Sequence, residues 1–272
     1  MSDCTTVLGA GIKFTEAFEI SHGIFLSPAK IEHNHIELMD RTNSKHEFGI
    51  ICSLSDTITF ELDAPDPDPK AAAVKLWNSQ WLVVFLSCII RKPVFDPIQK
   101  LQVDGKVSYK LTNVHFSNRI FQDAHIFTSE EKDFSLSHVQ GYLKINDSRF
   151  LHAASVAAHV HNEPKFSIRI IAIWSAIEAL LGVDHELSFR ISLLCARLLG
   201  NGQNERKVIF KETKKLHSIR SMCVHGSYSD NKKIDQALAE EQSLKLLTDL
   251  IFHFCRRESL LEKSEQTELL LQ

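Results

Sequence analysis

The sequence contains no closely spaced pair of cysteines. Its 6 cysteines are scattered singly along 272 residues, and none belongs to a Cys-x-x-Cys motif. Structural zinc sites and the disulfide frameworks of small secreted domains need cysteines at short, regular spacings. The sequence therefore predicts reduced thiols, no structural zinc site and a reducing compartment such as the cytoplasm.

A long hydrophobic run is also missing. A membrane-spanning helix needs about 20 consecutive apolar residues, and the best candidate, Trp81–Ile90, has about half that length before Arg91 and Lys92 follow. Residues 1–10 contain an aspartate and no basic residue ahead of an apolar run, which is unlike a signal peptide. We expect a cytoplasmic protein without a membrane partner.

Motifs for phosphate loops, dinucleotides and metal ions are absent as well. The chain has neither Gly-x4-Gly-Lys-Ser/Thr nor Gly-x-Gly-x-x-Gly. The letters His-Asn-His at 33–35 lack the widely spaced ligands of a ββα-metal nuclease, and no carboxylate joins His152, His159 and His161 in a ligand pattern. We expect no metal ion and no other cofactor.

A large excess of positive charge is missing, because the formal net charge is -3. This excludes a protein coated in basic residues for non-specific binding of nucleic acid. The segment from 190 to 220 is nevertheless locally basic. It contains only two acidic residues, Glu205 and Glu212, and its basic residues are Arg190, Arg197, Arg206, Lys207, Lys211, Lys214, Lys215 and Arg220. Such a segment indicates either a phosphate-facing surface or an ordinary solvated helix face.

The first half of the chain has the pattern of a mixed α+β domain. Short apolar and β-branched runs predict strands at 23–26, 47–51, 57–60 and within 106–127. Three prolines within 64–69 predict an extended connector or the lead into a helix, and an apolar stripe at helical spacing follows over 70–90. We place an N-terminal α+β domain at residues 1–145.

The second half reads as helical to its end, and we place an all-α domain at residues 146–272. Apolar residues recur there at i, i+3, i+4 and i+7, with short connections that favour antiparallel neighbours in a bundle. The predicted helices run from an Asp147 cap to about 161, through 170–181 to Gly182, over 188–198 to Gly200, from about 204 to 226, and from Asp230 or Ile234 towards Gln272.

Three segments of this helical half resemble Apea-like HEPN (higher eukaryotes and prokaryotes nucleotide-binding) domains. They are Trp-Ser-Ala-Ile-Glu-Ala-Leu-Leu-Gly at 174–182, Ser-Phe-Arg at 188–190 and Arg-Ser-Met-Cys-Val-His-Gly at 220–226, in the family's order. The resemblance covers residues 148–262. It implies an antiparallel bundle of about four to five helices that commonly dimerises. It also implies a metal-independent endoribonuclease of phage defence or toxin–antitoxin systems.

By this resemblance Arg220 and His225 are the catalytic pair, with Ser221 beside them. Many relatives carry Asn, Asp or His at the position of Ser221. A serine can form hydrogen bonds but cannot ionise, so we expect a weaker polar helper here. The resemblance implies no cofactor.

These residue types suit RNA cleavage without a metal ion. The 2′-hydroxyl of RNA can attack the adjacent phosphorus, so an enzyme must move protons and stabilise negative charge. A histidine that titrates near neutral pH moves the proton, and an arginine fork binds the phosphate. RNA, including tRNA, is therefore the expected partner, and the candidate RNA contacts are Arg190, Arg197, Lys214 and Lys215.

Helix geometry separates the two motif residues. Five residues turn a regular helix through about 500°, which leaves Arg220 and His225 about 140° apart. The pair meets only if the last turn distorts at Gly226 or if a second subunit completes the site. We expect a homodimer.

An alternative from a different class stays open, a catalytically silent HEPN module that acts as a sensor, adaptor or nucleotide-binding unit. Arg220 then pairs with a carboxylate such as Glu178, and His225 caps the end of its helix. Whatever the function, we expect Glu178 to orient one of Arg190, Arg197 and Arg220 rather than to transfer a proton. An antitoxin or defence-system protein is a further expected partner, and the N-terminal domain is expected to sense a trigger or to position RNA.

Overall fold

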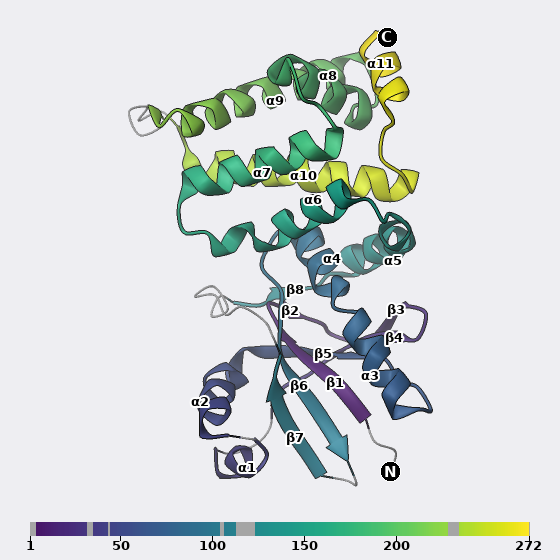
Figure 1. Cartoon of the computed structure of the whole chain (residues 1–272), viewed down its shortest axis with the longest axis vertical. Coiled ribbons are helices and arrows are strands. Elements are labelled where there is room, and N and C mark those ends of the chain that lie inside the picture. The colour runs from purple at the N-terminus through teal and green to yellow at the C-terminus, as the bar shows by residue number, and fades with distance from the viewer. Residues whose placement is uncertain are drawn as a thin grey trace. The chain divides into compact units, whose positions relative to one another are not determined.

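A computed structural model describes residues 4–31, 35–42, 44–103, 106–112, 123–227 and 234–271 (Figure 1). The chain divides into two compact units, Met1–Ser137 and His138–Gln272. The first unit contains an antiparallel sheet with helices, and the second is helical, so the predicted α+β class is confirmed. The predicted domain boundary at residue 145 lies a few residues after the observed division at Ser137. It coincides with the end of the helix Ser129–Lys144, which spans that division.

The first unit is built on a sheet with the strand order β3-β4-β5-β1-β6-β7, and every neighbouring pair is antiparallel. Its strands are β1 (Cys4–Ala10), β3 (Phe18–Ser21), β4 (Ile24–Pro28), β5 (Ile58–Asp63), β6 (Phe95–Val103) and β7 (Lys106–Leu111). A short parallel pair joins β2 (Ile12–Lys13) to β8 (His125–Ile126). The strands predicted near 23–26, 57–60 and the start of 106–127 are confirmed, whereas residues 113–122 lie outside the described part.

Helices α1 (His35–Asp40) and α2 (Lys45–Leu54) share a hydrophobic core with strands of the sheet. The strand predicted at 47–51 is wrong, because these residues belong to α2. The Ser44 hydroxyl accepts a hydrogen bond from the Glu47 backbone N–H at 3.1 Å, which satisfies a free donor at the helix start. Ile51 is fully buried in the core, so capping and burial outweigh the strand preference of its β-branched side chain.

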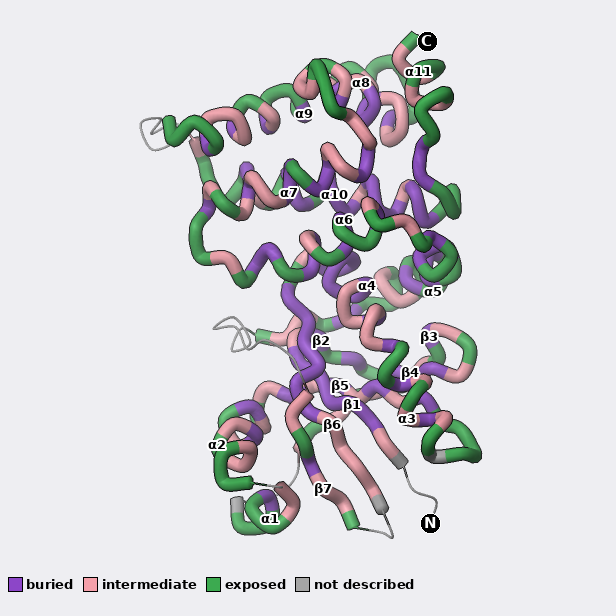
Figure 2. Tube along the Cα trace, viewed as in Figure 1, coloured by how far each residue is buried: buried purple, intermediate pink, exposed green. Residues whose placement is uncertain are grey.

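The single helix predicted over 70–90 is two helices, α3 (Pro69–Asn78) and α4 (Trp81–Ile90). The Asp68 carboxylate caps α3 at the Lys70 N–H, and Pro69 occupies its first turn, so the prolines do lead into a helix. The segment Lys70–Ile90, which comprises nearly all of α3 and the whole of α4, is long and apolar enough to cross a membrane by length and composition. Half of an apolar 18-residue stretch within it is buried. An internal helix of a soluble protein has the same properties, and the buried residues of α4 fit that interpretation (Figure 2).

The second unit contains the end of α5 (Ser129–Lys144) and the helices that follow it. These are α6 (Ser148–His159), α7 (Phe166–Leu181), α8 (Leu187–Leu199), α9 (Gln203–Val224), α10 (Gln236–Arg257) and α11 (Lys263–Leu271). Short 3-10 turns, η1 (Ser55–Thr57) and η3 (Val160–Asn162), follow α2 and α6. The predicted cap at Asp147 and the predicted stop at Gly182 are confirmed, with Gly182 in the left-handed region at φ 66°.

The observed helix α10 differs from the last predicted helix in two ways. It begins after Asp235, whose carboxylate accepts from the Leu238 N–H at 3.0 Å; the alternative start at Asp230 lies outside the described residues. It does not fray towards Gln272 but ends at Arg257, where Glu258 adopts a left-handed φ of 61°. Leu260 and Leu261 are buried in the turn before α11, so their burial holds that helix as a separate element.

The core of the second unit lies around α7 and α10. Each of these two helices contacts α6, α8 and α9 as well as the other, and Figure 2 shows the buried residues along both. Trp174 of α7 and Phe254 of α10 are fully buried. Helices α8 and α9 pair through the short connection at 200–202. This packing leaves one side of α9 in solvent.

Asp96 of β6 is a buried carboxyl whose Oδ2 has no hydrogen-bond partner among the described residues. Burial raises its pKa from 3.8 to about 7. The folded protein therefore keeps a proton that the unfolded chain releases, so its stability falls as the pH rises from about 4 to about 7. We expect Asp96→Asn to remove this part of the decline and to be more stable than wild type at pH 8 by about 2 kcal/mol. Urea unfolding of both proteins from pH 4 to 8 measures the difference, and parallel curves would contradict it.

Candidate functional site

Arg220 of α9 forms an ion pair with Glu178 of α7. The Arg220 Nη2 atom lies 2.9 Å from Glu178 Oε1 and donates a hydrogen bond to Oε2 at 3.2 Å. The two side chains are only 22% and 16% exposed. Burial raises the pKa of the Glu178 carboxyl, and the Arg220 guanidinium opposes that rise. Of the three arginines proposed as partners of Glu178, the structure selects Arg220.

The ion pair continues into a buried polar cluster. His217 lies three residues before Arg220 on α9, and its ring packs edge-on against Trp174 at 5.2 Å. The Trp174 indole N–H donates to the Ser243 hydroxyl of α10 at 3.3 Å. Burial, and secondly the Arg220 charge, lower the pKa of His217, which favours the neutral ring. The cluster therefore joins α7, α9 and α10 around the guanidinium.

His225 occupies the end of α9. Its backbone N–H donates to the Ser221 carbonyl at 3.1 Å, and Gly226 follows in the left-handed region at φ 71°. The imidazole is exposed and makes no hydrogen bond or ion pair with any residue that the structure describes. Its main chain, rather than its ring, completes the helix end.

Arg220 and His225 are not brought together within one chain. The helix continues regularly to Val224, and the bond from His225 to Ser221 has the normal i to i−4 spacing. Gly226 turns the chain only after His225, so the last turn is not distorted in the way one of the two predicted routes required. The guanidinium faces α7, whereas the imidazole faces solvent.

The candidate RNA contacts occupy different places. Arg190 pairs with Glu186, the residue just before α8, at 3.1 Å. Lys214 is exposed. Lys215 lines a groove of about 530 Å³ between α9 and α10. Arg197 lines a different pocket, between α8 and α9.

The pocket between α8 and α9, called here the α8–α9 pocket, has a volume of about 410 Å³. Its lining is Leu193, Ala196, Arg197, Gln203, Arg206, Lys207, Phe210 and Lys211. Four of these side chains are cationic and none is acidic. Within the described part of the chain, no carboxylate forms an ion pair with any of the four.

One face of α9 continues from this pocket to His225. Residues 207 and 225 are 18 positions apart, which is about five full turns, so their side chains share a direction. From residue 207 to residue 225, the residues within about 40° of that direction form what we call the basic stripe: Lys207, Lys211, Lys214, Ser218, Ser221 and His225. The acidic residues of α9, Glu205 and Glu212, instead line a separate pocket with Asp249 of α10.

No candidate metal centre occurs among the residues that the structure describes. They contain no group of three or more His, Cys, Asp or Glu side chains placed to hold a metal ion. Residues 33 and 34 of the His-Asn-His letters lie outside the described part. Cys223, inside the motif, is buried, and burial raises the pKa of its thiol, so it behaves as packing rather than as a nucleophile.

No known protein family, curated protein or solved structure matches this chain. The resemblance to HEPN domains therefore remains a prediction from the sequence motifs alone. The sequence alone did not point to His217 or Phe210, and it placed Arg206, Lys207 and Lys211 in the locally basic segment without naming them as RNA contacts. The i, i+3 spacing of His217 and Arg220, and the helical phase of the lysines with His225, are the signals that point to them.

Proposed function

We propose that this protein is a metal-independent endoribonuclease of the HEPN type, acting in the cytoplasm in phage defence or in a toxin–antitoxin system. The observation that carries the proposal is the exposed imidazole of His225 at the end of α9, which has no partner among the described residues and lies on a helix face whose other side chains are lysines and serines. An accessible histidine can move a proton on RNA, and cations on the same helix face can bind its phosphates.

In the proposed reaction a ribose 2′-hydroxyl attacks the neighbouring phosphorus and loses its proton. The bond from that phosphorus to the 5′-oxygen of the next nucleotide breaks, the 5′-oxygen takes up a proton, and a 2′,3′-cyclic phosphate remains. His225 removes or supplies the proton, and Arg220 stabilises the charge on the phosphate oxygens. Glu178 orients Arg220 and holds it within the bundle. Because Arg220 and His225 diverge on one helix, we propose that a second copy of the chain completes the site across a twofold axis.

A second candidate function is a catalytically silent HEPN module that binds a partner protein or a nucleotide. The observation that favours it is the Arg220–Glu178 ion pair, because a carboxylate already occupies the guanidinium that would bind phosphate. In that case the ion pair serves packing between α7 and α9 alone.

Incubation of the purified protein with total RNA and with tRNA in EDTA separates the two functions. We expect fragments that end in 2′,3′-cyclic phosphate, because the attacking group is the 2′-hydroxyl. A substrate of the same sequence with 2′-O-methyl riboses should stay intact. Absence of cleavage, or cleavage only with added divalent cations, would exclude the proposed mechanism and favour the silent module.

A further inference from the structure

Cations of the α8–α9 pocket lack counter-charges among the residues that the structure describes. Arg197, Lys207 and Lys211 form no ion pair with the described residues, although they line one cavity. The Nε atom of Arg197 is buried and has no acceptor among these residues. Like charges gathered without an anion repel each other, and a buried donor without an acceptor is costly. An anion in the pocket would relieve the repulsion between these cations.

The connection between the two helices positions a further cation. The Nε atom of Arg206 donates to the Gly200 carbonyl at 3.2 Å, so that guanidinium is held at one edge of the pocket. An added Cβ on Gly200 would lie 2.7 Å from Arg206 Cγ, which shows how closely the two residues approach. An arginine fixed in this way presents its remaining N–H groups to a phosphate at little entropic cost.

Aromatic surface accompanies the cations. Phe210 lines the pocket, and Phe189 of α8 packs edge-on against it with ring centroids 5.9 Å apart. Phe189 is 55% exposed, so its ring remains available to solvent. Aromatic rings interleaved with cations are typical of surfaces that bind single-stranded nucleic acid, because bases stack while lysines and arginines bind the backbone.

We propose that the α8–α9 pocket binds phosphate groups of single-stranded RNA and that the basic stripe of α9 leads the strand from the pocket to His225. This inference rests on the proposed ribonuclease function and assigns its substrate path. The path from Lys207 to His225 measures about 27 Å along the helix axis. Lys211 and Lys214 lie on it, whereas the acidic side chains of α9 face elsewhere.

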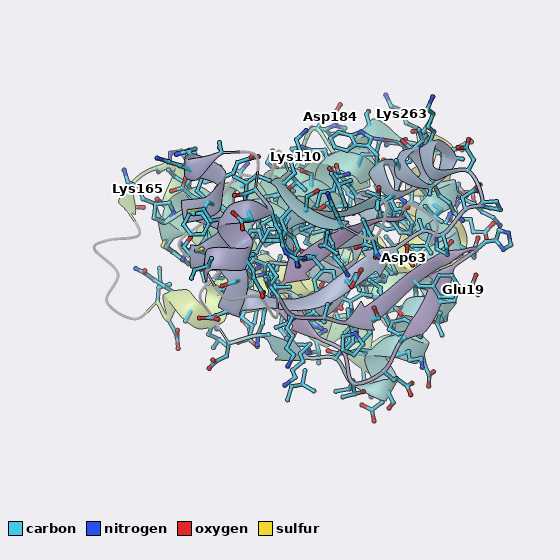
Figure 3. All side chains as sticks on the ribbon, turned by 90° about the horizontal axis from the view of Figure 1, so that it is seen from below. Glu19, Asp63, Lys110, Lys165, Asp184 and Lys263 are labelled. Atoms are coloured by element: carbon cyan, nitrogen blue, oxygen red, sulfur yellow. The ribbon has the colours of Figure 1, made fainter. Side chains whose placement is uncertain are left out.

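The test measures binding without cleavage, using a fluorescent 12-nucleotide single-stranded RNA that carries 2′-O-methyl riboses. Anisotropy titrations compare the wild-type protein with Lys207→Gln/Lys211→Gln. The matched control is Lys165→Gln/Lys263→Gln, which removes the same charge from two exposed lysines of the helical unit (Figure 3). Thermal melts check that all three proteins are folded.

We expect the pocket variant to bind this RNA about tenfold more weakly and the control variant to bind within about twofold of wild type. The slope of log K against log salt should fall by about 0.7 for each phosphate that the variant no longer neutralises. Equal binding by wild type and pocket variant, or equally weakened binding by both double variants, would overturn the inference. So would displacement of the RNA by micromolar AMP, since the site would then select free nucleotides.

His225→Ala distinguishes this inference from the proposed function. We expect that variant to lose cleavage but to keep the pocket-dependent binding of the methylated RNA, with a loss of affinity smaller than that of Lys207→Gln/Lys211→Gln, because the pocket lies at the other end of α9. If pocket-dependent binding is found and no RNA is ever cleaved, the binding site stands and the ribonuclease proposal falls. If RNA is cleaved and the pocket variant binds and cleaves as wild type does, the reverse holds.

Discussion

Replacing His225 by alanine is expected to lower the rate of RNA cleavage in EDTA by about 10² to 10⁴. The imidazole is exposed and makes no contact that the structure describes beyond its own helix end, so the midpoint of thermal unfolding should not change. His159→Ala is the matched control, because His159 is another exposed histidine at the end of a helix in the same unit. That variant should retain the activity of wild type.

Arg220→Ala should also lose activity, but its stability should fall together with its rate. The change leaves the Glu178 carboxylate without its partner in a site where that side chain is 16% exposed. Loss of one member of a partly buried pair costs about 1 to 3 kcal/mol. If His225→Ala retains activity, or melts earlier by as much as Arg220→Ala, then His225 does not act on substrate as we propose.

The helical half was largely predictable because its end signals are local. An aspartate cap begins α6, a left-handed glycine ends α7, and a further aspartate caps α10. Each of these groups acts on backbone atoms a few residues away, so the information lies within a short window of sequence. The start of α11 was not predicted, because it depends on the burial of Leu260 and Leu261 in the folded protein.

The sheet was harder to predict from the sequence. Strand β1 pairs with β5 and β6, which lie about 50 and 90 residues further on, and no local pattern records those partners. β6 contains Pro97, which argues against a strand when read alone. The break between α3 and α4 was also missed, since Ser79 and Gln80 carry no strong stop signal, and the Ser79 N–H bonds back to Leu76.

Part of the candidate site was likewise predictable from the sequence, and part of it was not. Arg220 was one of three arginines predicted as a partner of Glu178, because each of the two residues lies beside the apolar stripe of its own helix. The packing of α7 on α9 decides between the three. The phase of the lysines with His225 follows from helix geometry alone. The α8–α9 pocket does not, because the packing of α8 against α9 sets which side chains face each other.

Gly141→Ala is expected to lower the free energy of unfolding of the helical unit by at least about 3 kcal/mol. Gly141 lies where α5 meets α10, and an added Cβ would sit 1.9 Å from the Cys255 carbonyl oxygen and 2.7 Å from its carbon. These are backbone atoms of a long helix, so no side-chain rotation relieves the overlap. The helices must separate, which exposes Val139 and Tyr142, both buried beside Gly141 in the sequence.

Gly49→Ala provides the control for this change, since Gly49 is also inside a helix, α2, but has no atom within 4 Å of an added Cβ. Alanine has the higher helix propensity, so this variant should gain about 0.5 to 1 kcal/mol. Urea unfolding followed by circular dichroism measures both. A loss in Gly141→Ala no larger than about 1 kcal/mol would show that α5 and α10 are not in close backbone contact, and the packing that supports α7 and α9 would need a different description.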